Sequence, residues 1–258
     1  MIIAVDLDDT LLNSNREISN FNKKAFFEAK KQGYKIAVLT LRSMNRCKRF
    51  AKQIKADFVC AFLGNMIYDM NMKKVVCERP IVVDGFKTVV DEGRDILKSW
   101  IGFETEEKSC INSKKMLKIY DRVKFVKPEN LLSELNKNKV FKLSFGLEKK
   151  EQFVPEFEKI AKKHNLEMVV SKKLNFVDYF APNTNKVNAL KWLKENYPNE
   201  KIIMFGDSEP DKLSLEFADI GVAVNNASND VKRSANEVTD SNDENGVGKY
   251  ILKLLNNN

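Results

Sequence analysis

The first residues of the chain carry carboxylates whose spacing suits metal-assisted chemistry. The apolar run at residues 1–5 leads into Asp6, and Asp8 stands two positions further on. Such runs are typical of strands buried in a parallel sheet, where ligands bind beyond the carboxyl ends. The chain must curl after Asp6 if the two carboxylates take different roles, because alternate residues of a strand share one side. Their hard oxygens suit Mg²⁺, which would offset their repulsion, although an acidic turn after an edge strand has the same pattern.

Further polar residues stand where other expected strands end or helices begin. One apolar run, residues 35–40, ends in a threonine, and another, residues 201–206, is followed by two aspartates four positions apart. In a doubly wound sheet these ends meet at one crevice, where carboxylates, a hydroxyl and a lysine can hold a metal and a phosphate. Each residue taken singly also fits a strand, a turn or a helix start. The set is Thr40, Lys186, Asp207 and Asp211.

Composition excludes several classes of protein. The 258 residues are 43% hydrophobic and 31% charged, which is typical of a globular protein with a sizeable core. The net charge of +8 is spread evenly between residues 84–178 and the rest of the chain, so we expect no nucleic acid partner. No apolar run approaches the roughly 20 residues that span a bilayer, and the amino terminus does not resemble a signal peptide. Four cysteines without C-x-x-C spacing favour a reduced, cytoplasmic protein.

The two ends of the chain alternate strand and helix. This rhythm predicts a doubly wound parallel α/β sheet with a Rossmann-like architecture. A hairpin is expected within residues 66–78, and Ser19 is the expected N-cap of a helix that ends near Gly33. The other expected strands cover residues 35–40, 57–63, 201–206 and 220–224, and the other helices residues 43–54, 185–196, 211–218, 229–235 and 244–255.

The middle of the chain has a different pattern. Residues 83–178 predict an α+β module inserted between residues 1–82 and 179–258, which together form the first domain. Helices are expected at 86–100, 128–137 and 154–164, and strands at 116–120, 140–145, 167–170 and 176–180.

The strand-end residues resemble the four signature motifs of the haloacid dehalogenase-like phosphatases. The motifs are Asp6-Leu7-Asp8-Asp9-Thr10, Thr40, Lys186 and Gly206-Asp207-x-x-x-Asp211. The position of the insert is similar to that of a type IIB cap, and the segment 238–247 is similar to the carboxyl end of the Cof-type subfamily. The resemblance spans the core and is weaker in the insert. It implies a Mg²⁺-dependent phosphatase that acts on small phosphorylated metabolites such as sugar phosphates, as a monomer or homodimer without a membrane partner.

The resemblance also implies a role for each matching residue. Asp6 would be the nucleophile that forms an aspartyl-phosphate, and Asp8 the general acid and base. Mg²⁺ would be held by Asp6, by Asp207 and by the backbone carbonyl of Asp8. The residues implied to bind phosphate are Leu7, Asp8, Thr40, Leu41, Arg42 and Lys186. Thr40 and Lys186 would also assist catalysis. Thr10 and Asp211 would support the site.

The chain departs from the family pattern at three positions. Leu41 replaces a glycine, Leu63 replaces the asparagine that ends the third strand, and Pro210 replaces an asparagine before Asp211. These departures motivate an alternative, a catalytically weakened metabolite-binding protein. A phosphomutase with the same chemistry is another. A receiver domain is a further alternative, but it would need its acceptor aspartate at Leu63 and would lack the insert. The implied phosphatase mechanism needs neither His164 nor the cysteines.

Overall fold

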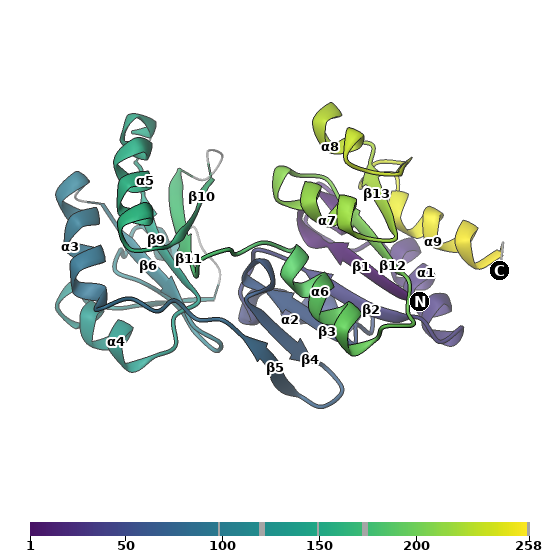
Figure 1. Ribbon diagram of the computed structural model, residues 1–258, viewed down its shortest axis with the longest axis horizontal. Helices are drawn as coiled ribbons and strands as arrows, with labels where there is room; N and C mark the ends of the chain where they lie inside the picture. The colour runs from purple at the N-terminus through teal and green to yellow at the C-terminus, as the bar shows by residue number, and fades with distance from the viewer. Residues whose placement is uncertain (98, 119–121, 149, 172–174, 257–258) are drawn as a thin grey trace. The chain divides into compact units, whose positions relative to one another are not determined.

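The computed structural model describes residues 1–97, 99–118, 122–148, 150–171 and 175–256 (Figure 1). The chain forms two compact units. The first comprises Met1–Arg42, Cys47–Cys77 and Asn185–Asn258, and the second Ser43–Arg46 and Glu78–Thr184. The boundaries predicted at residues 83 and 178 lie inside the second unit and stay predictions. Within the described ranges, no helix combines the length and the apolar character that crossing a membrane requires.

The first unit is built on an eight-stranded sheet. Its strands from β14 to β3 pair in parallel, and β4 runs antiparallel to β3. In sheet order they are β14 (Glu237–Thr239), β13 (Ile220–Val224), β12 (Ile202–Gly206), β1 (Ile2–Asp6), β2 (Lys35–Leu39), β3 (Phe58–Ala61), β4 (Met66–Asp69) and β5 (Lys74–Glu78). The expected hairpin is therefore present as β4 and β5, whereas β14 was not predicted.

Helices cover both faces of this sheet, as the doubly wound prediction requires. On one face Met204 of β12 belongs to a buried cluster with Leu190 and Leu193 of α6. On the other face the ring of Phe205 lies 5.4 Å from that of Tyr250 in α9. Adjacent strand residues point to opposite faces, so both faces of the strand are buried. The helices are α1 (Asn20–Lys31), α2 (Met44–Gln53), α6 (Val187–Asn196), α7 (Lys212–Phe217), α8 (Asn229–Arg233) and α9 (Gly246–Asn256).

Local signals set several of these boundaries. The Ser19 hydroxyl accepts the Asn22 N–H at 3.0 Å, which caps α1 as predicted and is worth about 1 kcal/mol. Gly33 follows the helix with φ +82°, the left-handed conformation that glycine adopts without strain.

The second unit is an α+β module with a six-stranded sheet. The sheet order is β10 (Glu167–Ser171), β11 (Phe176–Phe180), β9 (Lys142–Gly146), β6 (Ile101–Glu104), β7 (Ser109–Ile111) and β8 (Val123–Phe125). Its helices are α3 (Phe86–Ile96), α4 (Leu131–Lys137) and α5 (Val154–Lys163). The prediction of a strand at residues 116–120 was wrong at residues 116–118, which form a helical turn, while residues 119 and 120 lie outside the described residues. Strands β6, β7 and β8 were missed because three or four residues are too few for a clear alternation.

The two faces of this second sheet differ in chemistry. Phe103, Leu143 and Tyr179 belong to a hydrophobic cluster that includes residues of α3, α4 and α5. Their strand neighbours point the opposite way and include Lys142, Ser144 and Asp178, all at most 7% exposed. The Ser144 hydroxyl donates to Asp178 at 2.5 Å, and Lys142 lies 3.6 Å from the same carboxylate. We call these three residues, together with Glu104, the polar sheet face.

Candidate active site

The register of the first sheet brings the predicted strand-end residues to one edge. Asp6, the last residue of β1, pairs with Leu39 of β2, so Thr40 is the next residue along the neighbouring strand. On the other side Val5 pairs with Phe205 of β12, which places Asp207 two residues beyond that pair. Parallel strands end at the same edge, so the motifs converge although they are far apart in the sequence.

The chain curls after Asp6, as the spacing of the two aspartates required. Residues Leu7–Leu11 form an irregular turn in which Asp9 has the left-handed φ of 57°. The Leu12 N–H closes the turn on the Leu7 carbonyl at 2.8 Å. Asp6 is consequently 5% exposed, whereas the side chain of Asp8 is 52% exposed. One carboxylate is buried among charges and the other is open to solvent, so they can do different chemistry.

Lys186 joins Asp6 to a second aspartate from a distant segment. Its ammonium donates to Asp6 Oδ1 at 2.6 Å and to Asp211 Oδ1 at 2.7 Å, and the side chain is 3% exposed. Burial disfavours the ammonium, but Asp211 and Asp6 hold the pKa of Lys186 above its ordinary value. Gly64 allows the start of α6 to approach, because a Cβ there would lie 3.2 Å from the Ala189 nitrogen.

Asp211 is held in place by the segment that follows β12. Its Oδ2 accepts the Ser208 hydroxyl at 2.7 Å and the Ser208 N–H at 3.1 Å, with the Asp207 N–H at 3.3 Å. A Cβ on Gly206 would meet the Asp211 Cβ at 2.6 Å, so glycine is needed for the chain to fold back here. Pro210 lies in the first turn of the short helix Glu209–Asp211, where a missing N–H is tolerated.

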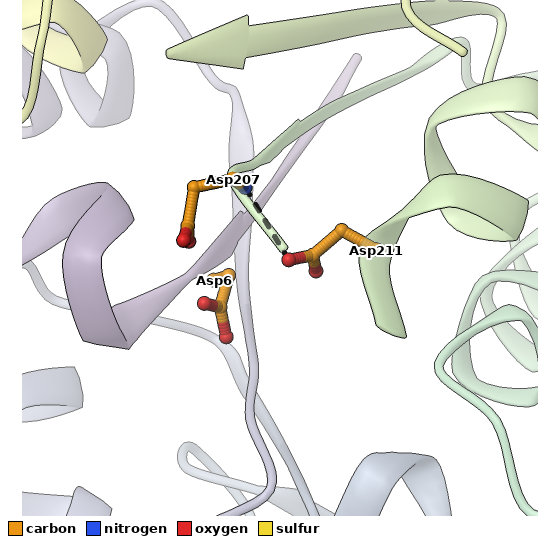
Figure 2. A group of neighbouring side chains, drawn as sticks. All are labelled: Asp6, Asp207 and Asp211. Carbon is orange, nitrogen blue, oxygen red and sulfur yellow. Dashed lines mark hydrogen bonds between the residues drawn. The ribbon is translucent and has the colours of Figure 1, made fainter. Parts of the chain in front are cut away.

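Three carboxylates gather at this point (Figure 2). Oxygens of Asp6, Asp207 and Asp211 lie within 4.8 Å of one another. Burial raises the pKa of Asp6 well above its ordinary value, more than Lys186 lowers it. Burial likewise raises the pKa of Asp207 to about 7, despite the Thr10 hydroxyl that donates to it at 2.5 Å. Burial is the largest cause of both shifts, and repulsion by the neighbouring carboxylates adds to it.

The hydrogen bonds indicate which of these oxygens a cation could use. Both oxygens of Asp211 accept hydrogen bonds, from Lys186 and from Ser208. Among the described residues, no donor is recorded for Oδ2 of Asp6 or Oδ2 of Asp207. The donor set is all oxygen, which fits Mg²⁺. Asp6 and Asp207 are therefore the carboxylates with an oxygen available for a cation, whereas the oxygens of Asp211 are used to hold Lys186 and Ser208.

The remaining predicted residues lie around this cluster. Thr40 is buried, and its hydroxyl accepts the Arg42 N–H at 3.2 Å. The Arg42 guanidinium holds Asp8 through both oxygens, with Nε 2.7 Å from Oδ2, and lies over the Phe50 ring at 5.1 Å. Arg42, expected to bind phosphate, thus pairs with the expected general acid in this structure. Leu41 is half-buried, and Leu7 is fully buried.

Sequence reasoning missed several supporting residues. Ser208 completes a capping box with Asp211, and the Ser-x-x-Asp spacing could have revealed it. Thr10 was expected to steady the Asp8 turn, and its bond to Asp207 in fact ties that turn to the end of β12. The Asn226 amide donates to the Asp9 carbonyl at 2.7 Å, a contact that no local sequence signal predicts.

Comparisons with known proteins agree with this geometry. The family model of the haloacid dehalogenase-like hydrolases matches residues 3–251. The chain is 30% identical over 255 residues to 5-amino-6-(5-phospho-D-ribitylamino)uracil phosphatase YcsE of Bacillus subtilis (strain 168), covering 97% of this chain and 94% of that protein. A haloacid dehalogenase-like hydrolase from Bacteroides thetaiotaomicron has a TM-score of 0.88 at 20% identity, with 98% of both chains covered. The HAD subclass IIB sugar phosphatase BT4131 has a TM-score of 0.78 at 20% identity, again over 98% of both chains.

The chain belongs to the family of haloacid dehalogenase-like hydrolases. The resemblance seen in the sequence, with its Cof-type and type IIB features, is confirmed, and so is the α/β fold class. The expectation of a phosphoric monoester hydrolase is confirmed as well. The roles assigned to individual residues stay predictions.

Proposed function

We propose that the protein is a Mg²⁺-dependent phosphatase that hydrolyses small phosphorylated metabolites through an aspartyl-phosphate on Asp6. The observation that supports this most is the buried Asp6, of which Lys186 holds one oxygen, whereas the other has no hydrogen-bond donor among the described residues. A carboxylate fixed in this way is oriented for attack on phosphorus. Lys186 neutralises charge on Asp6 and on the transferring group, and Asp211 orients Lys186.

The cation would be held by Asp6, Asp207 and the backbone carbonyl of Asp8. It would supply Lewis-acid stabilisation and offset the repulsion between two anions that must meet. Asp8 protonates the leaving alcohol and then accepts a proton from the attacking water. Phosphate oxygens are bound by the Thr40 hydroxyl, by backbone N–H groups of Leu7 and Leu41, and by Arg42, while Thr10 supports the turn. The exposure of Asp8 supports its role, because a general acid must reach an incoming substrate.

The nucleophile is tested by Asp6→Asn, with Asp9→Asn as the matched control. Both changes remove one carboxylate from the same turn, but Asp9 is exposed and has no part in the proposed reaction. We expect Asp6→Asn to abolish release of phosphate from p-nitrophenyl phosphate with Mg²⁺, and Asp9→Asn to retain most of it. Mass spectrometry of rapidly quenched wild-type enzyme should find a phosphoryl group on the Asp6 peptide. Unchanged activity in Asp6→Asn would refute the mechanism. Net isomerisation of a hexose monophosphate, with hexose bisphosphate as phosphoryl donor and without phosphate release, would indicate a mutase.

We propose that the polar sheet face of the second unit binds a ligand through its polar side chains. Glu104 and Asp178 each keep a buried oxygen with no hydrogen-bond partner among the described residues. Buried acceptors of this kind favour a ligand rich in hydroxyl or amine donors. This preference supports a phosphorylated sugar or polyol as the substrate. The name of the ribitylaminouracil phosphatase relative suggests that the first compound to test is one with a phosphorylated ribityl group, called a ribityl phosphate below.

The polar sheet face is tested with Ser144→Ala and, as control, Ser133→Ala on the exposed side of α4. Ser144→Ala should raise KM for a ribityl phosphate severalfold and leave kcat for p-nitrophenyl phosphate unchanged. Equal effects of the two variants would refute this assignment.

We also propose a cytoplasmic location, which the four free thiols support. The oligomeric state, monomer or homodimer, stays a prediction.

A further inference from the structure

A cavity in the first unit is lined by three cationic side chains. It has a volume of about 400 Å³ and is lined by the segment 15–18, by Lys23 of α1 and by one side of α2. None of the proposed catalytic residues lines it. A volume of this size is within the range of small-molecule sites.

The charges around this cavity are not balanced by the protein. Arg16, Lys23 and Arg49 line it, and among the described residues none of the three has a recorded hydrogen bond or ion pair through its charged group. The single acidic lining residue, Glu17, likewise has no recorded cationic partner within the described part of the chain. The cavity thus has an excess of two positive charges. By contrast, Lys30 of α1 is paired with Asp57 at 2.7 Å.

Local contacts position the side chain of Arg49 and the backbone of Arg16. The guanidinium of Arg49 lies 4.6 Å from the centre of the buried Phe50 ring, which restricts its motion. Arg16 has the left-handed φ of 60° in a turn closed by its N–H on the Asn13 carbonyl at 2.7 Å. The Asn13 side chain accepts two further N–H groups of that turn, from Asn15 and Glu17.

The position of Lys23 gives an independent indication. It lies in the first turn of α1, which contains no acidic residue. The positive end of the helix dipole disfavours a cation at this position. An anion bound in the cavity would reverse that penalty, and it would also satisfy Arg16 and Arg49.

We propose that this cavity binds the dianionic phosphate group of a small phosphorylated metabolite at a site separate from the catalytic cluster. Two guanidinium groups and one ammonium recognise the phosphate, and the Glu17 carboxylate and Gln53 amide accept hydrogen bonds from hydroxyl groups of the ligand. Phosphate recognition by arginine follows from its fork of donors.

The experiment is a calorimetric titration of glucose 6-phosphate, orthophosphate and glucose into Asp6→Asn protein without Mg²⁺, which cannot hydrolyse the ester by the proposed mechanism. Both phosphate compounds should bind and glucose should not. The double variant Arg16→Gln/Arg49→Gln should weaken one binding event at least about tenfold. Lys52→Gln is the matched control, because Lys52 is exposed on the same helix and does not line the cavity.

The outcomes separate a built site from general attraction to a basic protein. Loss of the binding event in the double variant alone supports the site, and higher salt should weaken it. An equal loss in Lys52→Gln, no loss in the double variant, or no binding of either phosphate at millimolar concentration would overturn the proposal. The double variant in the wild-type background should keep its p-nitrophenyl phosphatase activity, which shows that it is folded. A double variant that is inactive or unfolded is replaced by Arg49→Lys, which keeps the charge but should weaken binding because it loses the fork of donors.

Discussion

Lys186→Met is the sharpest test of how the buried charges are balanced. The substitution keeps an unbranched apolar side chain and removes the ammonium that donates to Asp6 at 2.6 Å and to Asp211 at 2.7 Å. At an effective dielectric constant of about 20, one such pair interacts by about 6 kcal/mol, most of which offsets desolvation. Breaking a buried pair by removing one partner costs about 3–5 kcal/mol, because the other charge stays buried alone. We expect a loss of this size in the free energy of unfolding of the first unit near pH 8 without metal.

The loss should depend on pH with a defined sign. Burial places the pKa of Asp207 at about 7 in the folded protein, above its ordinary value of 3.8. The folded state therefore binds more protons than the unfolded state between these values, and stability falls as pH rises through this window. Removing the nearby ammonium increases the repulsion among the ionised carboxylates. The difference between Lys186→Met and wild type should consequently be smaller near pH 5 than near pH 8.

Urea denaturation measures this loss when the signal comes from the first unit alone. Trp192 of α6 packs on Phe58 with ring centres 5.6 Å apart, so its fluorescence in a Trp100→Phe background reports on that unit. Lys191→Met is the control, because Lys191 is exposed on the same helix. Adding Asp211→Asn to Lys186→Met should recover part of the loss. A loss below about 1 kcal/mol, equal losses at both pH values, or a deeper loss in the double variant would refute the reasoning.

Three further predictions concern the same site. Gly206→Ala should lower phosphatase activity at least about tenfold with little change in circular dichroism, because its Cβ displaces Asp211; full activity would contradict the close contact. Mg²⁺ at a hundredfold excess over its Kd should stabilise the first unit by about 2.7 kcal/mol. Its Kd should be larger near pH 6 than near pH 8, because protons compete for Asp207; calorimetry that finds no pH dependence would contradict this. Arg42→Gln should reduce kcat/KM for p-nitrophenyl phosphate at least about tenfold. Arg42→Lys should restore part of it, and wild-type kinetics in Arg42→Gln would exclude a role for the guanidinium.

The first sheet and its site could be predicted because their signals are local. Three of the apolar strands lead into a polar residue at the carboxyl end, so the strand pattern alone predicted that Asp6, Thr40 and Asp207 lie at one edge. Lys186 was expected at the same crevice, but its direct contact with Asp6 joins residues 180 positions apart and no local pattern predicts it. Nothing in the local sequence shows that Gly64 brings α6 close enough for that contact.

The second unit was predicted less well for a physical reason. Strands β6, β7 and β8 have three or four residues, and their pairing, not their own pattern, keeps them extended. The expected helix over 86–100 ends at Ile96, and Ile101 already begins β6. The burial of Lys142 and Asp178 was also invisible in the sequence, because it arises from contacts between strands.

Two of the three departures from the family pattern, Leu63 and Pro210, leave the charged network in place. Leu63 has the left-handed φ of 56°, which asparagine tolerates better than leucine, but its side chain is only 3% exposed. Burial of an apolar side chain of this size contributes about 1.5–3 kcal/mol, which is comparable with the backbone strain of about 1–3 kcal/mol that it offsets. Pro210 loses an N–H that the first turn of a helix does not use. Neither residue donates to the aspartates, so neither departure removes a charged contact.

The charge balance of the site gives the pairing of Arg42 with Asp8 a place in the proposed mechanism. Asp6, Asp207 and Asp211 with Lys186 carry a formal charge of −2, which one Mg²⁺ would neutralise. A phosphate dianion entering the proposed site then needs further positive charge, and Arg42 can supply it only by leaving Asp8. In the proposed mechanism Asp8 donates a proton to the leaving alcohol, and an Arg42 side chain that moves to the phosphate leaves the Asp8 carboxyl free for this role. Comparing kcat/KM of Arg42→Gln and wild type for p-nitrophenyl phosphate tests whether the guanidinium serves the phosphate.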